Sequence, residues 1–232
     1  MKKIFLALFA FVLASSASVA QEIVLSMDPA VDTTEETKGP NLKNYSHMFM
    51  GFGMCVDPGE VGGKNVIPHL NHFNYGFRYK RRLAEHFALG WELGYSLNDY
   101  LLKQDSSKTT PDSLNYSRQR LIFHNAQAGV YMRFNFGRRG NTLGNYLDLG
   151  GYGDVVFSHV QFQKYKLADG AVVRARITQL DYFQRLNYGL QARIGIKKVM
   201  FYGQYRLSDI FYPSKHLAEM PRITAGIQFV LN

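Results

Sequence analysis

The sequence predicts an all-β protein, an eight-stranded antiparallel up-and-down transmembrane β-barrel. The clearest segment is His86–Asn98, in which large apolar residues alternate strictly with small or polar ones. A period of two gives a β-strand one apolar face and one polar or crowded face. Seven other segments show the same alternation, and long polar loops alternate with short turns between them. In outer-membrane barrels the apolar face of each strand contacts lipid, and the polar face lines the interior.

The amino-terminal residues have the pattern of a secretory signal peptide. Two lysines precede the apolar stretch Ile4–Ala14, and Ser18 and Ala20 place small residues before a cleavage site. The apolar stretch is too short to span a bilayer as a helix. The predicted domains are a signal peptide at residues 1–20, a flexible periplasmic segment at 21–43 and the barrel at 44–232.

The first four predicted strands follow the periplasmic segment. Asn44–Val56 sets methionines and a phenylalanine against glycines on the other face. In His69–Arg82 aromatic residues alternate with Asn, Gly, Arg and Lys, and a short turn leads into His86–Asn98. After a long polar loop, Tyr116–Phe136 sets Ile, Ala, Val, Met and Phe against Asn, Gln, Tyr and Arg. Segments of about ten residues or more are long enough to cross a membrane at a tilt.

The last four predicted strands show the same pattern. Asn145–Gln163 and Arg176–Ile196 set aliphatic and aromatic residues against Asp, Arg, Asn and Gly. Val199–Phe211 and Pro221–Asn232 complete the set. The last strand must pair with the first, because lipid offers no hydrogen bonds to an open sheet edge. An even number of strands places both mature termini in the periplasm, where the short turns also lie.

The alternation assigns a set of charged side chains to the barrel interior. These are Arg78, Glu92, Arg133, Asp148, Asp154, Arg185, Arg193, Arg206 and Arg222. An eight-stranded barrel is just wide enough for side chains to fill. We expect a structural network in which arginines bridge carboxylates, because an unpaired buried charge is costly. A narrow ion path or a ligand pocket is the alternative interpretation of the same residues.

No motif predicts catalysis, a metal site or a cofactor. Ser158 and His159 are adjacent, so on a strand they point to opposite faces and cannot form a catalytic dyad. Asp148 and Asp154 share a face but lie ~20 Å apart along the strand, too far for a carboxylate pair. Three histidines near the predicted outer rim are expected to be solvated rather than bound to a metal. They are His69, His72 and His124.

The chain is basic, with a formal net charge of +9 at pH 7. For an exported protein this charge favours outer-membrane lipid and lipopolysaccharide as partners over nucleic acid. Basic turns at Lys80–Arg82, 138–139 and Lys197–Lys198 are expected at the periplasmic head groups. Further basic residues are expected outside, facing lipopolysaccharide phosphates. They are Lys103, Lys108, Lys164, Lys166, Arg174 and Lys215.

Two segments near the carboxyl end carry a resemblance to a known family. KKVMFYGQYRLSDIF at Lys197–Phe211 and MPRITAGIQFVLN at Met220–Asn232 resemble the last hairpin of the PorT-like outer-membrane β-barrel proteins of Bacteroidota. The resemblance implies an eight-stranded outer-membrane barrel. One member of that family is required for type IX protein secretion, and no catalytic residues come with the family.

From these observations we expect a non-enzymatic integral outer-membrane β-barrel with no cofactor. It would act as a structural, assembly or protein-secretion accessory component, as a subunit of a larger outer-membrane complex. Its protein partners would lie in the outer membrane or the periplasm. A small pore or ligand-binding barrel, and a lipid-modifying outer-membrane enzyme, are the two alternatives.

Overall fold

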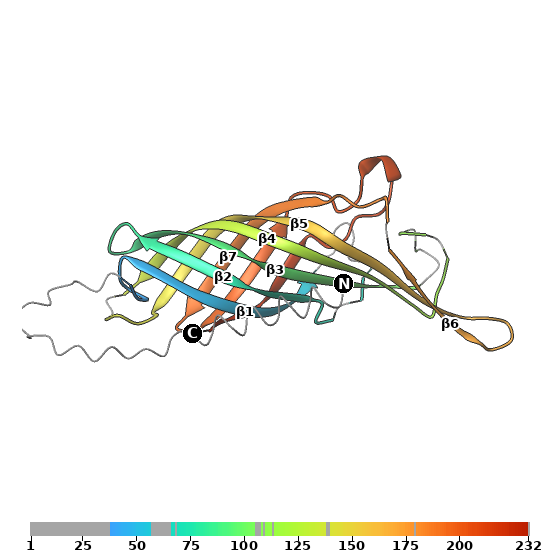
Figure 1. Cartoon of the computed structure of the whole chain (residues 1–232), viewed down its shortest axis with the longest axis horizontal. Helices are drawn as coiled ribbons and strands as arrows, with labels where there is room; N and C mark the ends of the chain where they lie inside the picture. Colours follow the sequence, from blue (N-terminus) through green and yellow to red (C-terminus); the bar gives the residue numbers. More distant parts are fainter. Residues whose placement is uncertain are drawn as a thin grey trace, which may run out of the picture. The chain divides into compact units, whose positions relative to one another are not determined.

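The computed structural model describes residues 38–56, 66–67, 69–104, 108, 110–112, 114–137, 140–178 and 180–231. The predicted signal peptide and residues 21–37 of the predicted periplasmic segment lie outside these residues. The described residues and all of their strands belong to one compact unit, residues 36–232 (Figure 1).

The described residues of this unit are all-β apart from a short 3₁₀ helix, η2 (Pro213–Lys215). Its strands are β1 (Asn44–Val56), β2 (His72–Arg82), β3 (Phe87–Leu102), β4 (Arg118–Phe136), β5 (Asn145–Lys166), β6 (Val172–Ile177), β7 (Leu186–Ile196), β8 (Val199–Arg206) and β9 (Ile223–Leu231). Within the described residues, no helix has both the length and the apolar character needed to cross a membrane.

Eight of the nine strands close into a ring. The hydrogen-bonded order is β4-β3-β2-β1-β9-β8-β7-β5-β6, and a further pairing of β4 with β5 closes the ring. All of these pairings are antiparallel. β1 pairs with β9 from Met48↔Leu231 to Val56↔Ile223, so the predicted pairing of first and last strands is confirmed. β6 lies outside the ring and pairs with β5 alone.

The predicted strand Arg176–Ile196 is wrong in its extent, because two strands separated by a turn at residues 181–182 take its place. The first part of β5 pairs with β7, and its last residues pair with β6. The apolar–polar alternation of the sequence continues through this break, but there it does not mark a strand. Leu180 and Tyr182 instead pack against an apolar cluster at the loop end of the ring.

Burial alternates along the ring strands and defines an outward and an inward face. From Leu186 to Ile196 each residue of β7 is exposed or buried in strict turn. The exposed positions are apolar, whereas the buried ones include Asn187, Gln191 and Arg193. Trp91 on β3 is 41% exposed. A sandwich of two sheets would instead bury such a residue between its layers.

The inward face is layered along the ring. At the end with the short turns, Phe49, Tyr146, Met200 and Val230 form a small apolar cluster. Most polar and charged side chains follow in the middle. A larger apolar cluster closes the end with the long loops. It contains Cys55, Val66, Tyr100, Leu102, Leu121, Phe123, Val156, Phe183, Ile210, Phe211 and Met220.

Glycine at the short-turn end makes room for Tyr146. A Cβ added at Gly195 would lie 2.1 Å from Cζ of the buried Tyr146 ring. We expect Gly195→Val to lower the free energy of unfolding by about 1–3 kcal/mol, because an overpacked interior must shift. Gly203→Val is the matched control, since nothing lies within 4 Å of a Cβ added there. Denaturant unfolding measures both variants, and equal stability of the two would contradict this packing.

Candidate functional site

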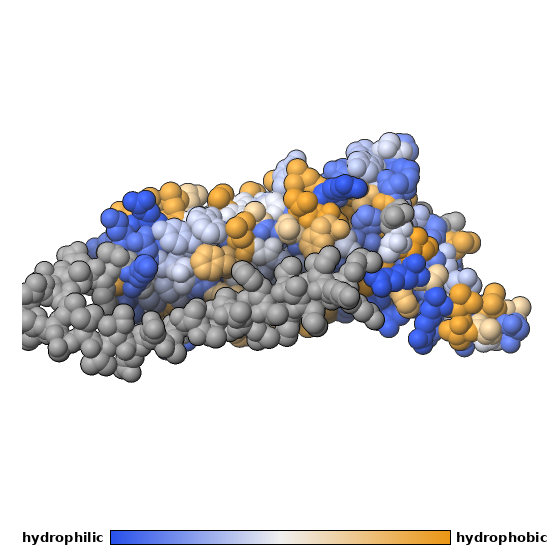
Figure 2. Space-filling view, in the orientation of Figure 1, coloured by the Kyte–Doolittle hydropathy of each residue, from blue (hydrophilic) through white to orange (hydrophobic). Residues whose placement is uncertain are grey.

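Exposed apolar side chains form a band on the outward face of the ring, and all eight ring strands contribute to it. Figure 2 shows apolar patches along the ring, hydrophilic residues near both ends, and further apolar residues at the tip of the β5–β6 hairpin. Examples from five strands are Phe52, Phe77, Leu93, Val130 and Leu190. A soluble monomer rarely exposes contiguous apolar patches larger than a few hundred Å². Such a face is unusual for a surface that contacts only water.

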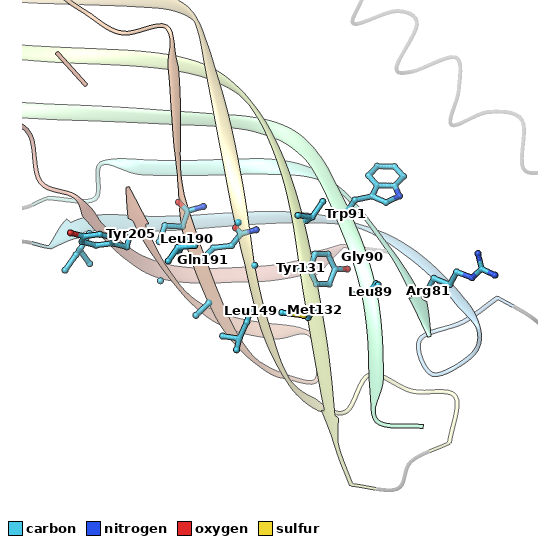
Figure 3. A pocket seen from close by; sticks show the side chains of 17 residues that line it. Arg81, Leu89, Gly90, Trp91, Tyr131, Met132, Leu149, Leu190, Gln191 and Tyr205 are labelled. Atoms are coloured by element: carbon cyan, nitrogen blue, oxygen red, sulfur yellow. The ribbon is translucent and has the colours of Figure 1, made fainter. Parts of the chain in front are cut away.

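A shallow groove of about 1150 Å³ crosses this band from Arg81 on β2 to Ile223 on β9 (Figure 3). Large side chains such as Trp91 flank it, and small outward residues such as Gly203 leave its floor open. Its lining is almost wholly apolar. The groove fits flexible hydrocarbon better than a polar ligand, because it offers few groups that could orient one.

Glu92 is the centre of the charged network inside the ring. Its Oε2 accepts a hydrogen bond from Nε of Arg78 at 2.8 Å. Its Oε1 accepts hydrogen bonds from Nε2 of Gln191, at 2.8 Å, and from Nη2 of Arg193. Glu92 lies on β3 and Arg193 on β7, so this ion pair crosses the interior and ties opposite walls together.

A second carboxylate extends the network toward the short-turn end. Nε and Nη2 of Arg133 donate to the two carboxylate oxygens of Asp148 at 2.7 and 2.8 Å, the bidentate arrangement that makes such pairs strong. Nη1 of Arg193 lies 3.9 Å from Asp148 Oδ2. The guanidinium of Arg133 also stacks 3.7 Å from the centre of the Tyr146 ring. The carboxylates of Glu92 and Asp148 are thus paired with three guanidinium groups. These belong to Arg78, Arg133 and Arg193.

Aromatic rings compensate the remaining positive charge. The Tyr131 ring centre lies 5.8, 5.5 and 5.7 Å from the guanidinium carbons of Arg78, Arg133 and Arg193 respectively. Phe49 lies 4.2 Å from the Arg78 guanidinium carbon on another side. The three arginines are at most 2% exposed. The charged network and the two apolar clusters therefore occupy the inward face of the ring.

The structure places seven of the nine charged residues assigned to the interior in buried positions. Five of them form the network around Glu92 and Asp148. Asp154 and Arg206 are also buried, nearer the loop end. Nη2 of Arg206 lies 3.0 Å from Glu219 Oε1, a carboxylate that the sequence pattern did not assign to the interior.

Two of the assigned residues lie elsewhere. Arg185 is exposed, because the chain bends just before β7 begins and the alternation of β7 does not extend to it. Arg222 precedes β9 and is half-buried, and it donates to Leu207 O at 2.9 Å and to the Asp209 carboxylate. Both differ from the predicted interior placement. Lys80 was expected at the periplasmic head groups, but its side chain is buried and donates to Pro40 O at 2.5 Å.

The histidines differ in their surroundings, and Ser158 on β5 lies directly opposite His124 on β4. His72 is buried, not solvated as predicted, and its Nδ1 lies 2.8 Å from Asn98 Oδ1. His159 Nε2 accepts a hydrogen bond from the backbone of Leu180 at 3.0 Å. No group of three or more His, Cys, Asp or Glu among the described residues is arranged to hold a metal ion.

Comparisons of the chain with protein-family models, with curated proteins and with solved structures gave no match. The resemblance of the last predicted hairpin to PorT-like proteins therefore stays a prediction. We infer function from the burial, pairing and charge of the described residues.

Proposed function

We propose that the protein is an integral outer-membrane β-barrel that acts without catalysing a reaction, as a structural, assembly or protein-secretion accessory subunit of a larger outer-membrane complex. The observation that carries the proposal is the inverted polarity of the ring. Arg78, Arg133 and Arg193 are among its largest fully buried side chains, whereas leucines, isoleucines and phenylalanines are exposed. Water as the surrounding solvent would favour the reverse.

The height of the apolar band supports a membrane, rather than water, as the medium that surrounds the ring. All outward positions of β7, from Leu186 to Ile196, are apolar. Ten residue steps of about 3.3 Å, on a strand tilted by about 40°, span about 25 Å along the ring axis. This matches the apolar band of outer-membrane barrels, which is about 25 Å tall.

The two ends of the ring support an orientation. β1 begins and β9 ends at the short-turn end, where Lys43, Arg81 and Lys198 are exposed. Short turns and both termini are periplasmic in outer-membrane barrels, and the long loops are extracellular. In this orientation the three basic residues lie at the periplasmic head groups.

The buried ion pairs favour a structural role over transport. Glu92 joins β3 to β2 and β7, and an apolar cluster lies toward each end. In a structural role the ring would offer partners its loops, its turns and its outward face. The resemblance to the PorT-like family, one member of which serves type IX secretion, agrees with an accessory role.

Isolation from native membranes tests the proposal. A tagged chain expressed at its natural level is expected in the outer-membrane fraction, and mild detergent is expected to release it with a stoichiometric protein partner. An unrelated tagged outer-membrane barrel, treated identically, identifies proteins that bind non-specifically. Recovery in the soluble periplasmic fraction would contradict the membrane assignment, and recovery from the membrane without a partner would contradict the role as a subunit.

A further inference from the structure

Three strands continue past the rim of the ring at the loop end. The last pairing of β5 with β7 is Val155↔Leu186, but β5 runs on to Lys166. There it is flanked by β4 on one side and β6 on the other. In Figure 1 the β5–β6 hairpin projects from the loop end as an arm. On one face of this small sheet, Gln119, Gln161 and Gln163 are buried, and the opposite face points outward.

A row of like charges crosses this arm. Arg118 on β4 lies directly opposite Lys164 on β5, and Lys164 lies directly opposite Arg174 on β6. Side chains directly opposite each other on adjacent strands share a face, with Cβ atoms about 5 Å apart. Like charges in this position repel each other and destabilise the sheet. Folding alone therefore does not account for three cations in register on three strands.

The neighbouring positions extend the row into a basic face. Two residues along the strands, Arg120 and Arg176 flank Phe162, and these side chains point the same way as the row. The basic face consists of Arg118, Arg120, Lys164, Lys166, Arg174 and Arg176. Asp99 pairs with Arg120, with a 2.9 Å hydrogen bond from Nε. Among the described residues no carboxylate lies within ion-pair distance of the other five.

The basic face is on the outer side of the ring wall. On β4 the alternate residues Gln119, Leu121 and Phe123 are buried in the interior, so Arg118 and Arg120 point outward. The basic face thus continues the apolar band beyond its loop-end border. Given the proposed function, on which this step rests, that border lies at the head groups of the outer leaflet.

We propose that the basic face binds the phosphate groups of lipopolysaccharide in the outer leaflet. Phosphates on one such glycolipid, and on its neighbours, present several negative charges above the hydrocarbon, which matches cations spaced along adjacent strands. Arginine suits phosphate because its planar fork donates two parallel hydrogen bonds. An anion bound in this way relieves the repulsion within the row.

Two other basic residues expected to face lipopolysaccharide have partners within the chain. Lys108 is buried, and its Nζ lies 3.0 Å from Asp112 Oδ1. Lys215 lies 3.0 Å from Asp181 Oδ2, and its hydrogen bond lowers the pKa of the Asp181 carboxyl. Among the described residues, Arg120 alone of the basic side chains on the arm has a carboxylate partner.

The test uses the full mature chain in non-ionic detergent and purified lipopolysaccharide. Replacing Arg118, Lys164 and Arg174 together by serine is expected to weaken binding by roughly tenfold, the sum of three exposed ion pairs. The control replaces Lys43, Arg81 and Lys198 by serine, which removes the same charge from the short-turn end. The control is expected to bind like the wild type. Binding of the wild type is expected to weaken with salt and with chemically dephosphorylated lipopolysaccharide.

Several outcomes would overturn the proposal. They are equal affinity of the arm variant and the wild type, undiminished binding of dephosphorylated lipopolysaccharide, and competition by millimolar inorganic phosphate, which would indicate a simple anion site. Retention of an acidic protein by the arm in place of lipopolysaccharide would overturn it as well. Recovery of both variants in the outer membrane keeps this result separate from the membrane assignment of the proposed function, which fails if the wild type itself is not in the membrane.

Discussion

Glu92→Ala is expected to lower the free energy of unfolding by about 3–5 kcal/mol, the usual effect of removing one partner from a buried ion pair. The change leaves the guanidinium groups of Arg78 and Arg193 with less compensation in a site from which water is excluded. It also removes the contact that joins β3 to β7 across the interior. Denaturant-induced unfolding in detergent micelles measures the loss.

Glu85→Ala is the matched control for Glu92→Ala. Glu85 lies in the short turn before β3, and its side chain is 71% exposed. Surface changes of this kind usually alter stability by less than about 0.5 kcal/mol. If Glu92→Ala were as mild as Glu85→Ala, the network would not be the structural core of the ring.

Leu190→Arg is expected to make folding into a bilayer less favourable by about 2–4 kcal/mol, the cost of a cation on a lipid-facing strand at the membrane midplane. Leu190 lies near the middle of β7, and its side chain is 56% exposed. In water the same substitution on an exposed strand position would cost little. The size of the energetic cost therefore distinguishes hydrocarbon from water around Leu190. Denaturant titration of the chain folded into lipid vesicles measures it.

Leu167→Arg is the control for Leu190→Arg, because it makes the same change outside the band. Leu167 is 48% exposed, in the turn between β5 and β6. We expect its free energy of folding to stay within about 0.5 kcal/mol of the wild type. Equal costs at both positions would mean that Leu190 does not face hydrocarbon.

The ring could be predicted from sequence because period-two alternation is local and strong. β1 begins and ends at the predicted residues, Asn44 and Val56, and Trp91 lies on the outward face. The pairing of β1 with β9 followed from a physical constraint on membrane sheets, not from any residue. The same alternation wrongly placed Arg185 in the interior. The chain bends there, and the polarity of a single side chain does not indicate a bend.

The pairing of charges could not be predicted, since it depends on register. Arg78 lies directly opposite Glu92, and Asp148 lies directly opposite both Arg133 and Arg193 on its two neighbouring strands. A shift of two residues would preserve every face but separate these pairs. Contacts across the interior, such as Glu92 with Arg193, depend in addition on the closure of the ring.

The arm was missed for a related reason. Residues 164–174 contain Asp169-Gly170, a pair typical of turns, and are therefore predicted as a loop. In the structure only residues 167–171 form the turn, and both flanks are paired strands. The individual lysines and arginines could be placed outside the membrane from sequence, but their alignment across three strands required the register.

The most direct test of the membrane assignment uses Trp91, the only tryptophan of the chain. Its side chain points outward from β3 beside the apolar groove (Figure 3). When the full chain is folded into vesicles, lipids brominated on their acyl chains are expected to quench the fluorescence of Trp91 strongly, and aqueous iodide is expected to have little effect. Strong quenching by iodide with no effect of the brominated lipids would contradict the membrane assignment.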